Sequence, residues 1–236
     1  MRKILLTMFV ALSLISIGGM SRQTVSAASQ GDVVVQSIPG PTVSDKLGTR
    51  VKTSWSWYLT RASGLIAAFT LVILMLSGIG QVTGYTYKLL DPITSWASHR
   101  ALGIAFGVSV LVHVFSLLFD KFVKFNLLDL FVPWLSHYKP VTIFGIHFGS
   151  LYVAFGVLAF YLVGIIIVTS LLWVEKKPYI WKWIHLMSYV AIFLVFIHAL
   201  YIGTDLAHGF WRYLWIFLAL SILAAAIQRL WRLRNV

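Results

Sequence analysis

Cysteine is absent from this sequence, which excludes disulfide bonds, cysteine-ligated zinc, iron–sulfur clusters, thiol catalysis and covalently attached c-type haem. Charged residues are also scarce: they make up 11% of the 236 residues, whereas 59% are hydrophobic. Soluble domains usually contain about a quarter charged residues. This composition, with a mean hydropathy of +0.87, predicts a membrane protein without a separate soluble domain.

Acidic residues are the scarcer charged class, with seven Asp and Glu against 19 Lys and Arg, and the formal net charge is +12. Such an excess could serve nucleic-acid binding, but the basic residues lie between apolar runs and at the C-terminus. Lipid headgroups and the cytoplasmic face of a membrane account for that distribution. We expect membrane lipid, and no nucleic acid, as a partner.

The N-terminal region has the pattern of a targeting segment. Arg2 and Lys3 precede an apolar stretch, and the small residues at 25–27 would form a cleavage site. We interpret residues 1–28 as a signal peptide, with an uncleaved signal anchor as the alternative. Residues 29–53 contain Gly, Pro, Ser and scattered charge without periodicity, and we expect them to form an exported flexible segment.

The rest of the chain, residues 54–236, is predicted to be one membrane domain of the all-α class. Apolar runs of about 20 residues are the signature of membrane-spanning helices. We expect a polytopic membrane helix bundle with five transmembrane helices, or six if the signal is an uncleaved helix. The five are expected at about residues 55–81, 93–119, 148–174, 179–203 and 210–226.

Two basic segments set the expected orientation in the cell membrane. Residues 175–182 and the Arg-rich C-terminal end fall on the same side in this helix count, and the positive-inside rule places both in the cytoplasm. The N-terminus is then outside if the signal is cleaved. Between the second and third helices, residues 122–135 mix aromatic and charged residues and suit an interfacial segment.

Four histidines lie inside two of the expected helices, where histidine is rare and usually functional because hydrocarbon does not solvate a polar ring. The second helix holds His99 and His113, fourteen residues apart, and the fourth holds His185 and His198, thirteen apart. The two helices run parallel, and these spacings correspond to two levels roughly 20 Å apart. We predict that His99 faces His185 and His113 faces His198, each pair holding the metal of one haem as axial ligands.

The spacing in the fourth helix predicts an irregularity. At about 100° per residue, fourteen residues return to nearly the same face, whereas thirteen miss it by about 140°. We therefore expect a bend or local irregularity between His185 and His198, or a side chain that reaches sideways. Gly103 and Gly107 would admit a porphyrin edge or serve close helix packing. A single membrane histidine is more often a hydrogen-bonded packing residue, so the repeated pairing is what favours haem.

Three basic residues lie near these histidines. Arg61, inside the first helix, would either snorkel to the interface or act as a counter-charge for a haem propionate or an acceptor. Arg100 and Lys182 lie close to the cytoplasmic pair. They are candidate propionate partners, with ordinary loop charges as the alternative.

Three short patterns carry a family resemblance: Trp57-Tyr58…Arg61-Ala-Ser-Gly64, His99-Arg100…His113…Asp120, and Trp183…His185…Tyr189…His198…Gly203-Thr204-Asp205. They resemble the ferric reductase-like transmembrane domain family, which includes ferric-chelate reductases, NADPH oxidases and the haem-binding membrane subunit of the periplasmic methionine sulfoxide reductase system. The resemblance implies two b-type haems, with electrons passing from the cytoplasmic to the exterior face. It implies an inner haem on His99 and His185, an outer haem on His113 and His198, and Arg61 near the outer one on the acceptor side.

Eukaryotic ferric reductases and NADPH oxidases continue into flavin- and NADPH-binding domains, whereas this sequence ends at Val236, directly after its last expected helix. We therefore expect an oxidoreductase component, an electron-transfer subunit with flavin only on a partner protein. The donor would be a cytosolic flavoprotein reductase or membrane quinol, and the exterior acceptor ferric iron, oxygen or a partner redox protein. A haem-free membrane transporter or scaffold and a quinol-oxidising cytochrome b are the alternatives.

Overall fold

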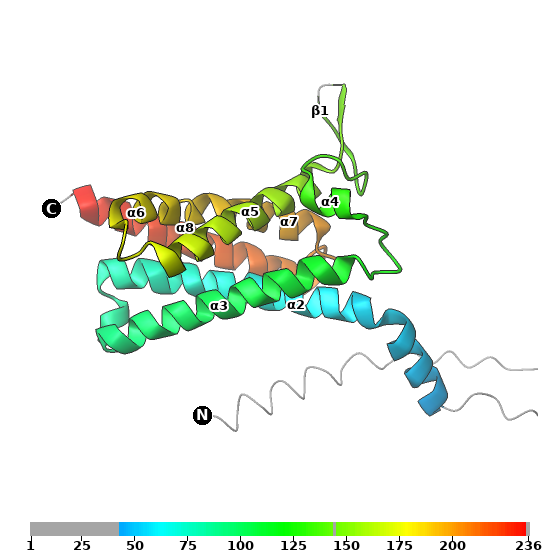
Figure 1. Cartoon of the computed structure of the whole chain (residues 1–236), viewed down its shortest axis with the longest axis horizontal. Coiled ribbons are helices and arrows are strands. Elements are labelled where there is room, and N and C mark those ends of the chain that lie inside the picture. Colours follow the sequence, from blue (N-terminus) through cyan, green and yellow to red (C-terminus); the bar gives the residue numbers. More distant parts are fainter. Residues whose placement is uncertain (1–42, 144, 235–236) are drawn as a thin grey trace, which may run out of the picture. The chain divides into compact units, whose positions relative to one another are not determined.

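The computed structural model describes residues 43–143 and 145–234 (Figure 1). The expected signal peptide, residues 1–28, and residues 29–42 lie outside the described residues. The predicted all-α membrane bundle is confirmed: within the described ranges, five helical spans are long and apolar enough to cross a membrane. They are α2 (Val43–Thr83), α3 (Pro92–Leu117), α5 (Leu151–Leu172), α6 (Pro178–Leu186) together with α7 (Ser188–Ile202), and α8 (Gly209–Arg234).

Local sequence explains where two of these helices begin. The Asp91 carboxylate accepts a hydrogen bond from the Thr94 N–H at 3.0 Å, and Pro92 occupies the first turn of α3. The Ser150 hydroxyl accepts one from the Val153 N–H at 3.2 Å at the start of α5. Such side chains satisfy backbone donors that have no partner within the helix. The hydrogen bonds from Thr94 also lower the pKa of Asp91.

Helix α2 begins at Val43, well before the expected start near residue 55. Residues 43–53 of the segment expected to be flexible, 29–53, are therefore helical in the structure. Helix formation is limited by its nucleus, while each added residue costs little. Since the following apolar span already supplies a stable helix, the polar stretch before it, which contains no proline, extends that helix.

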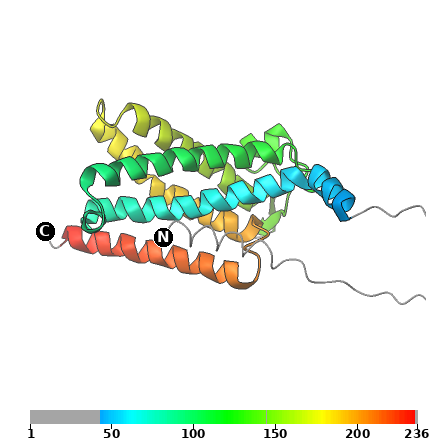
Figure 2. The same ribbon diagram turned by 90° about the horizontal axis from the view of Figure 1, so that it is seen from below.

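The bundle is built from two helix pairs. The α2 and α3 helices lie side by side, joined by the short 3₁₀ helix η1 (Thr86–Lys88), and α5 lies along α7 (Figures 1 and 2). Helix α8 packs on α2 (Figure 2). The core runs along α2. Trp215 of α8 belongs to it and stacks on Phe196 of α7 with ring centres 4.6 Å apart. Other core residues are Ala67, Leu71, Val72, Phe106, Val163 and Ala191.

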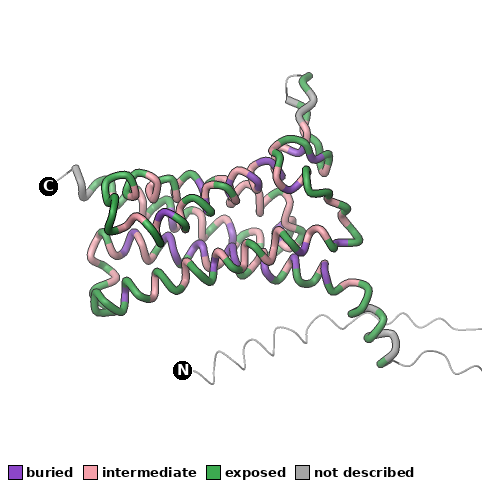
Figure 3. Tube along the Cα trace, viewed as in Figure 1, coloured by how far each residue is buried: buried purple, intermediate pink, exposed green. Residues whose placement is uncertain are grey.

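The outward faces of the helices are apolar, as membrane contact requires. Exposed positions along the spans are occupied by large hydrophobic residues, among them Ile66, Ile73, Val108, Leu111 and Phe193 (Figure 3). A water-soluble bundle would place polar residues there. The same pattern supports lipid as the surrounding medium.

The fourth span is not one continuous helix. Helix α6 ends at Leu186 and α7 begins at Ser188, and between them the Met187 N–H donates to the Ile184 carbonyl at 3.0 Å. This is a three-residue step instead of the four-residue step of an α-helix. The predicted irregularity between His185 and His198 is confirmed, and it lies two residues beyond His185.

One end of the bundle carries additional structure that the sequence pattern only partly indicated. The expected interfacial segment contains the short helix α4 (Leu127–Phe131), started by a reciprocal pair of hydrogen bonds between Asn126 and Asp129. After it, strands β1 (Val141–Ile143) and β2 (Ile146–Phe148) form an antiparallel hairpin that extends from this end (Figure 1).

Candidate functional site

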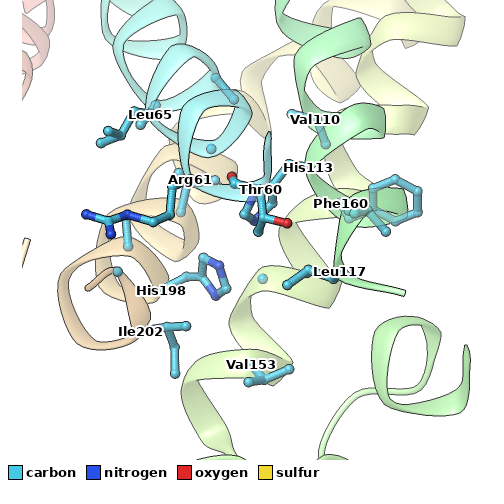
Figure 4. A pocket seen from close by; sticks show the side chains of 18 of the residues that line it. Thr60, Arg61, Leu65, Val110, His113, Leu117, Val153, Phe160, His198 and Ile202 are labelled. Atoms are coloured by element: carbon cyan, nitrogen blue, oxygen red, sulfur yellow. The ribbon is translucent and has the colours of Figure 1, made fainter. Parts of the chain in front are cut away.

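Two of the four membrane histidines line one apolar cavity. His113 of α3 and His198 of α7 face a space of about 240 Å³ whose walls come from α2, α3, α5, α7 and the segment that follows α7. Figure 4 shows both imidazoles among apolar side chains such as Leu117 and Val153. The cavity therefore offers two nitrogen ligands in a setting from which water is largely excluded.

The orientation of His113 is fixed by helix α2. Its Nδ1–H donates to the Thr60 carbonyl oxygen at 2.9 Å. The hydroxyls of Thr60 and Ser116 are hydrogen-bonded to each other at 2.6 Å, which ties α2 to α3 beside the ring. Gly64 leaves the room that the ring occupies, because a Cβ there would lie 2.9 Å from Nδ1.

His198 is held in the same way by helix α5. Its Nδ1–H donates to the Tyr152 carbonyl oxygen at 2.8 Å. A Cβ at Gly156 would lie 2.6 Å from Nδ1, so only glycine admits the ring at this distance. Tyr152 in turn stacks on Tyr201 of α7, with ring centres 4.3 Å apart, which keeps α5 and α7 in register.

These two hydrogen bonds determine the tautomer. A carbonyl oxygen can only accept, so Nδ1 carries the proton in both His113 and His198. A neutral imidazole then has its lone pair on Nε2, the nitrogen that is left to bind a metal. Metal-ligating histidines typically donate their other ring N–H to a backbone carbonyl or carboxylate in this manner.

The second pair, His99 of α3 and His185 of α6, forms a similar arrangement. Their ring centres lie 6.3 Å apart with an interplanar angle of 58°. Nδ1 of His99 is hydrogen-bonded to the Ser77 hydroxyl at 2.8 Å, and Nδ1 of His185 to the Ser170 hydroxyl at 3.3 Å. The Trp181 indole N–H also donates to Ser170 at 3.1 Å. All four histidines thus have Nδ1 engaged.

The separation of His99 and His185 fits a metal bound between them. An imidazole–metal bond of about 2.0–2.1 Å on each side, with about 1 Å from each nitrogen to its ring centre, places two ring centres about 6 Å apart. The observed ring-centre distance of 6.3 Å is close to this value, which applies when both Nε2 atoms point at one metal. Histidine is one of the side chains that hold haem iron.

Within residues 43–143 and 145–234, no group of three or more His, Cys, Asp and Glu residues could hold a metal ion. The histidines therefore form pairs and no larger ligand group in this part of the chain.

Arg61 lines the cavity of His113 and His198 and forms an ion pair there. Its guanidinium forms a two-pronged ion pair with the Asp205 carboxylate, with Nε donating to Oδ2 at 2.8 Å and Nη2 to Oδ1. It also lies 4.0 Å from the ring centre of Trp57. Arg61 and Asp205 both line the cavity of His113 and His198, so the arginine is placed beside the site with its charge balanced by a partner that sequence reasoning did not assign.

Arg100 and Lys182, the candidate propionate partners near His99 and His185, have exposed side chains. The Arg100 guanidinium carbon lies 5.4 Å from the centre of the Trp96 ring. Gly103 and Gly107 were expected to admit a porphyrin edge or to serve close helix packing. A Cβ at Gly107 would lie 2.8 Å from the Ile167 side chain, whereas a Cβ at Gly103 would meet nothing within 4 Å. Packing is therefore the observed role of Gly107.

The third expected helix contributes more than sequence reasoning assigned to it. Helix α5 contains no histidine and no charged residue, so its sequence alone indicates only packing and spacing. Instead it supplies the Tyr152 carbonyl, the Gly156 gap and the Ser170 hydroxyl, which position one histidine of each pair. A backbone carbonyl has no sequence signal, and Gly156 would have been recognisable only by its place opposite His198.

Comparisons with known proteins identify no relative: no family model, no curated protein and no solved structure matches this chain.

Proposed function

We propose that this chain is a transmembrane electron-transfer protein of the ferric reductase-like class. It would hold one b-type haem between His99 and His185 and a second between His113 and His198. The observation that carries the proposal is shared by all four histidines. Each has Nδ1 hydrogen-bonded to a protein oxygen, which leaves Nε2 of every ring as the available ligand atom.

In this function the protein would hold the haems, orient the imidazole rings and keep water away from the haems. The four Nε2 atoms would hold the haem irons, and the hydrogen bonds at Nδ1 would keep the rings from rotating. For His113 and His198, donation from Nδ1–H to a carbonyl would also raise the basicity of Nε2. When bound, haem supplies reversible one-electron chemistry, which no side chain of this chain needs to perform. The apolar walls of the outer cavity, such as Phe106, Val110 and Val163, exclude water and so favour one-electron transfer over side reactions.

The spacing of the histidines supports transfer across the membrane. His99 and His113 lie on one helix, fourteen residues apart, which corresponds to about 20 Å along the axis. Two sites at that separation divide a hydrocarbon core of about 30 Å into short steps. A single site would leave one face of the membrane out of reach.

The direction of transfer follows from the basic segments. With the Lys-rich turn 175–182 and the C-terminal end in the cytoplasm, the pair His99 and His185 is the inner one. A cytosolic flavoprotein reductase or membrane quinol would be the donor. The outer pair, beside the Arg61–Asp205 ion pair, would pass electrons to an exterior acceptor: ferric iron, oxygen or a partner redox protein.

The proposal is tested by counting haems in protein purified from membranes. We expect a reduced b-type spectrum and two haems per chain by pyridine haemochrome assay. The double variant His113→Ala/His198→Ala should retain one haem. His137→Ala is the matched control, because His137 is exposed in the segment outside the spans, and it should retain both.

Two outcomes would contradict the proposal. A colourless wild-type protein, expressed with haem supplied, would favour a haem-free transporter or scaffold. A double variant that keeps two haems would show that His113 and His198 are not ligands. Comparing reduction by a flavin reductase with NADPH against reduction by quinol would then separate the two classes of donor.

A further inference from the structure

Arg229 of α8 lies near the end of the candidate membrane span Gly209–Trp231. It differs from Arg61 in having no acidic partner among the described residues. Its Nη1 donates to the Tyr189 hydroxyl at 2.7 Å. Its Nε is buried and, in the part of the chain that the structure describes, has no hydrogen-bond partner.

No acidic side chain among the described residues balances the charge of Arg229, whose guanidinium lies 5.8 Å from the Tyr189 ring centre. Among the described residues, Arg61 with Asp205 is the only side-chain ion pair, and the phenol that Arg229 contacts is neutral. A cation in a membrane span is expensive and ordinarily faces an anion or a functional site. An unpaired buried donor adds a desolvation cost. Both features indicate a missing anionic oxygen ligand.

The position of Arg229 associates it with the inner histidine pair. Tyr189, to which it is bound, lies one turn beyond His185 in the same span. The neighbouring Gln228 donates to the Tyr85 hydroxyl at 3.4 Å, next to the turn between α2 and α3. Helix α6, the start of α3 and the end of α8 lie at one end of the bundle (Figures 1 and 2).

We propose that Arg229 binds the carboxylate of a propionate on the haem held by His99 and His185. This inference rests on the proposed function. With Nη1 occupied by Tyr189, the guanidinium keeps the edge formed by Nε and Nη2, which suits two parallel hydrogen bonds to a carboxylate. The exposed Arg100 and Lys182 lack this desolvated setting. A lipid phosphate presents the same oxygen chemistry, and the experiment separates the two.

The test is a redox titration of the purified protein, followed at the haem absorption bands, for wild type, Arg229→Gln and Arg229→Lys. A cation beside a haem favours the reduced form, so its removal lowers the midpoint potential. For Arg229→Gln we expect about a tenfold change in the reduction equilibrium of one haem, or ~59 mV for a one-electron couple. The other haem, and both haems in Arg229→Lys, should stay near wild type. Arg100→Gln is the matched control and should shift neither haem.

The outcomes separate the inference from the proposed function. A colourless wild type overturns the function itself. A coloured Arg229→Gln protein with two haems at wild-type potentials overturns the inference alone, and a simultaneous loss of co-purifying phospholipid would assign Arg229 to lipid. If Arg229→Gln loses one haem entirely, recovery of that haem in Arg229→Lys supports the inference. Loss in both variants overturns it.

Discussion

The imidazole of His198 lies against helix α5 at Gly156 so closely that a single added carbon would stand 2.6 Å from its Nδ1. Helix α5 fixes the ring through two residues one turn apart. The Tyr152 carbonyl accepts a hydrogen bond from Nδ1–H, and Gly156 leaves the space that the ring occupies. The position of the His198 ring thus depends on a residue that carries no functional group.

Replacing Gly156 by alanine should therefore remove the outer haem. The new methyl group would push His198 off its hydrogen bond, and overpacking of this kind costs about 1–3 kcal/mol. We expect Gly156→Ala to retain one haem per chain by pyridine haemochrome assay. Gly164→Ala is the control, since it lies two turns further along α5 with nothing within 4 Å of its added Cβ. Two haems in Gly156→Ala would show that the ring tolerates displacement.

Loss of the Ser77 hydroxyl should loosen the inner haem. Ser77 holds Nδ1 of His99 at 2.8 Å, and removing such a partner typically costs 10–100-fold in metal affinity. We expect Ser77→Ala to lose one haem to a haem-scavenging protein about tenfold faster than wild type. Ser109→Ala is a matched control on α3, because its exposed hydroxyl contacts only the Ala105 carbonyl. Equal rates in both variants would mean that Ser77 does not position His99.

The Arg61–Asp205 pair should couple the first span to the segment that follows α7. The side chains are 32% and 24% exposed, so the pair is less screened than a surface ion pair. A double-mutant cycle with Arg61→Gln and Asp205→Asn should give a coupling free energy of about 1 kcal/mol for thermal unfolding in detergent. Each single variant should be destabilised, and the double variant should lose less than their sum. Strictly additive losses would contradict the coupling.

The cap at Asp91 predicts a dependence of stability on pH. Hydrogen bonds from Thr94 lower the pKa of Asp91 below its ordinary value of 3.8, so the ionised carboxylate is favoured in the folded state. The stabilisation is present above that ordinary value and is lost as the pH falls through the lowered one. The Tm difference between wild type and Asp91→Ala should thus be seen at pH 7 and shrink toward pH 3. A difference independent of pH would point to the shape of the cap instead of its charge.

Features that repeat along the chain could be predicted from the sequence. The five spans follow from apolar runs, and the break at Met187 follows from the thirteen-residue interval between His185 and His198, which a regular helix cannot place on one face. The interval of fourteen residues on α3 needs no such correction, and α3 is continuous from Pro92 to Leu117. Periodicity carries this information because it constrains the helix itself.

Features that depend on contacts between distant segments could not be predicted in this way. Arg61 and Asp205 are separated by 144 positions, and nothing in the sequence around either residue identifies the other as its partner. Arg229 was grouped with the basic C-terminal end because its contact with Tyr189 arises only when α8 packs against the bundle. The start of α2 at Val43 could not be predicted from the polar residues there, because they show no helical periodicity. They are helical because the neighbouring span provides the helix nucleus.

The two histidine pairs differ in how they would respond to random mutation. His113 and His198 are oriented by main-chain oxygens, those of Thr60 and Tyr152, and every amino acid at those two positions would still present the same oxygen. His99 and His185 depend on the side chains of Ser77 and Ser170, which a single codon change can delete. Substitution of Thr60 or Tyr152 would thus leave the hydrogen-bond acceptors of His113 and His198 in place. The ring orientation of His99 and His185 persists in evolution only if both serine hydroxyls are kept.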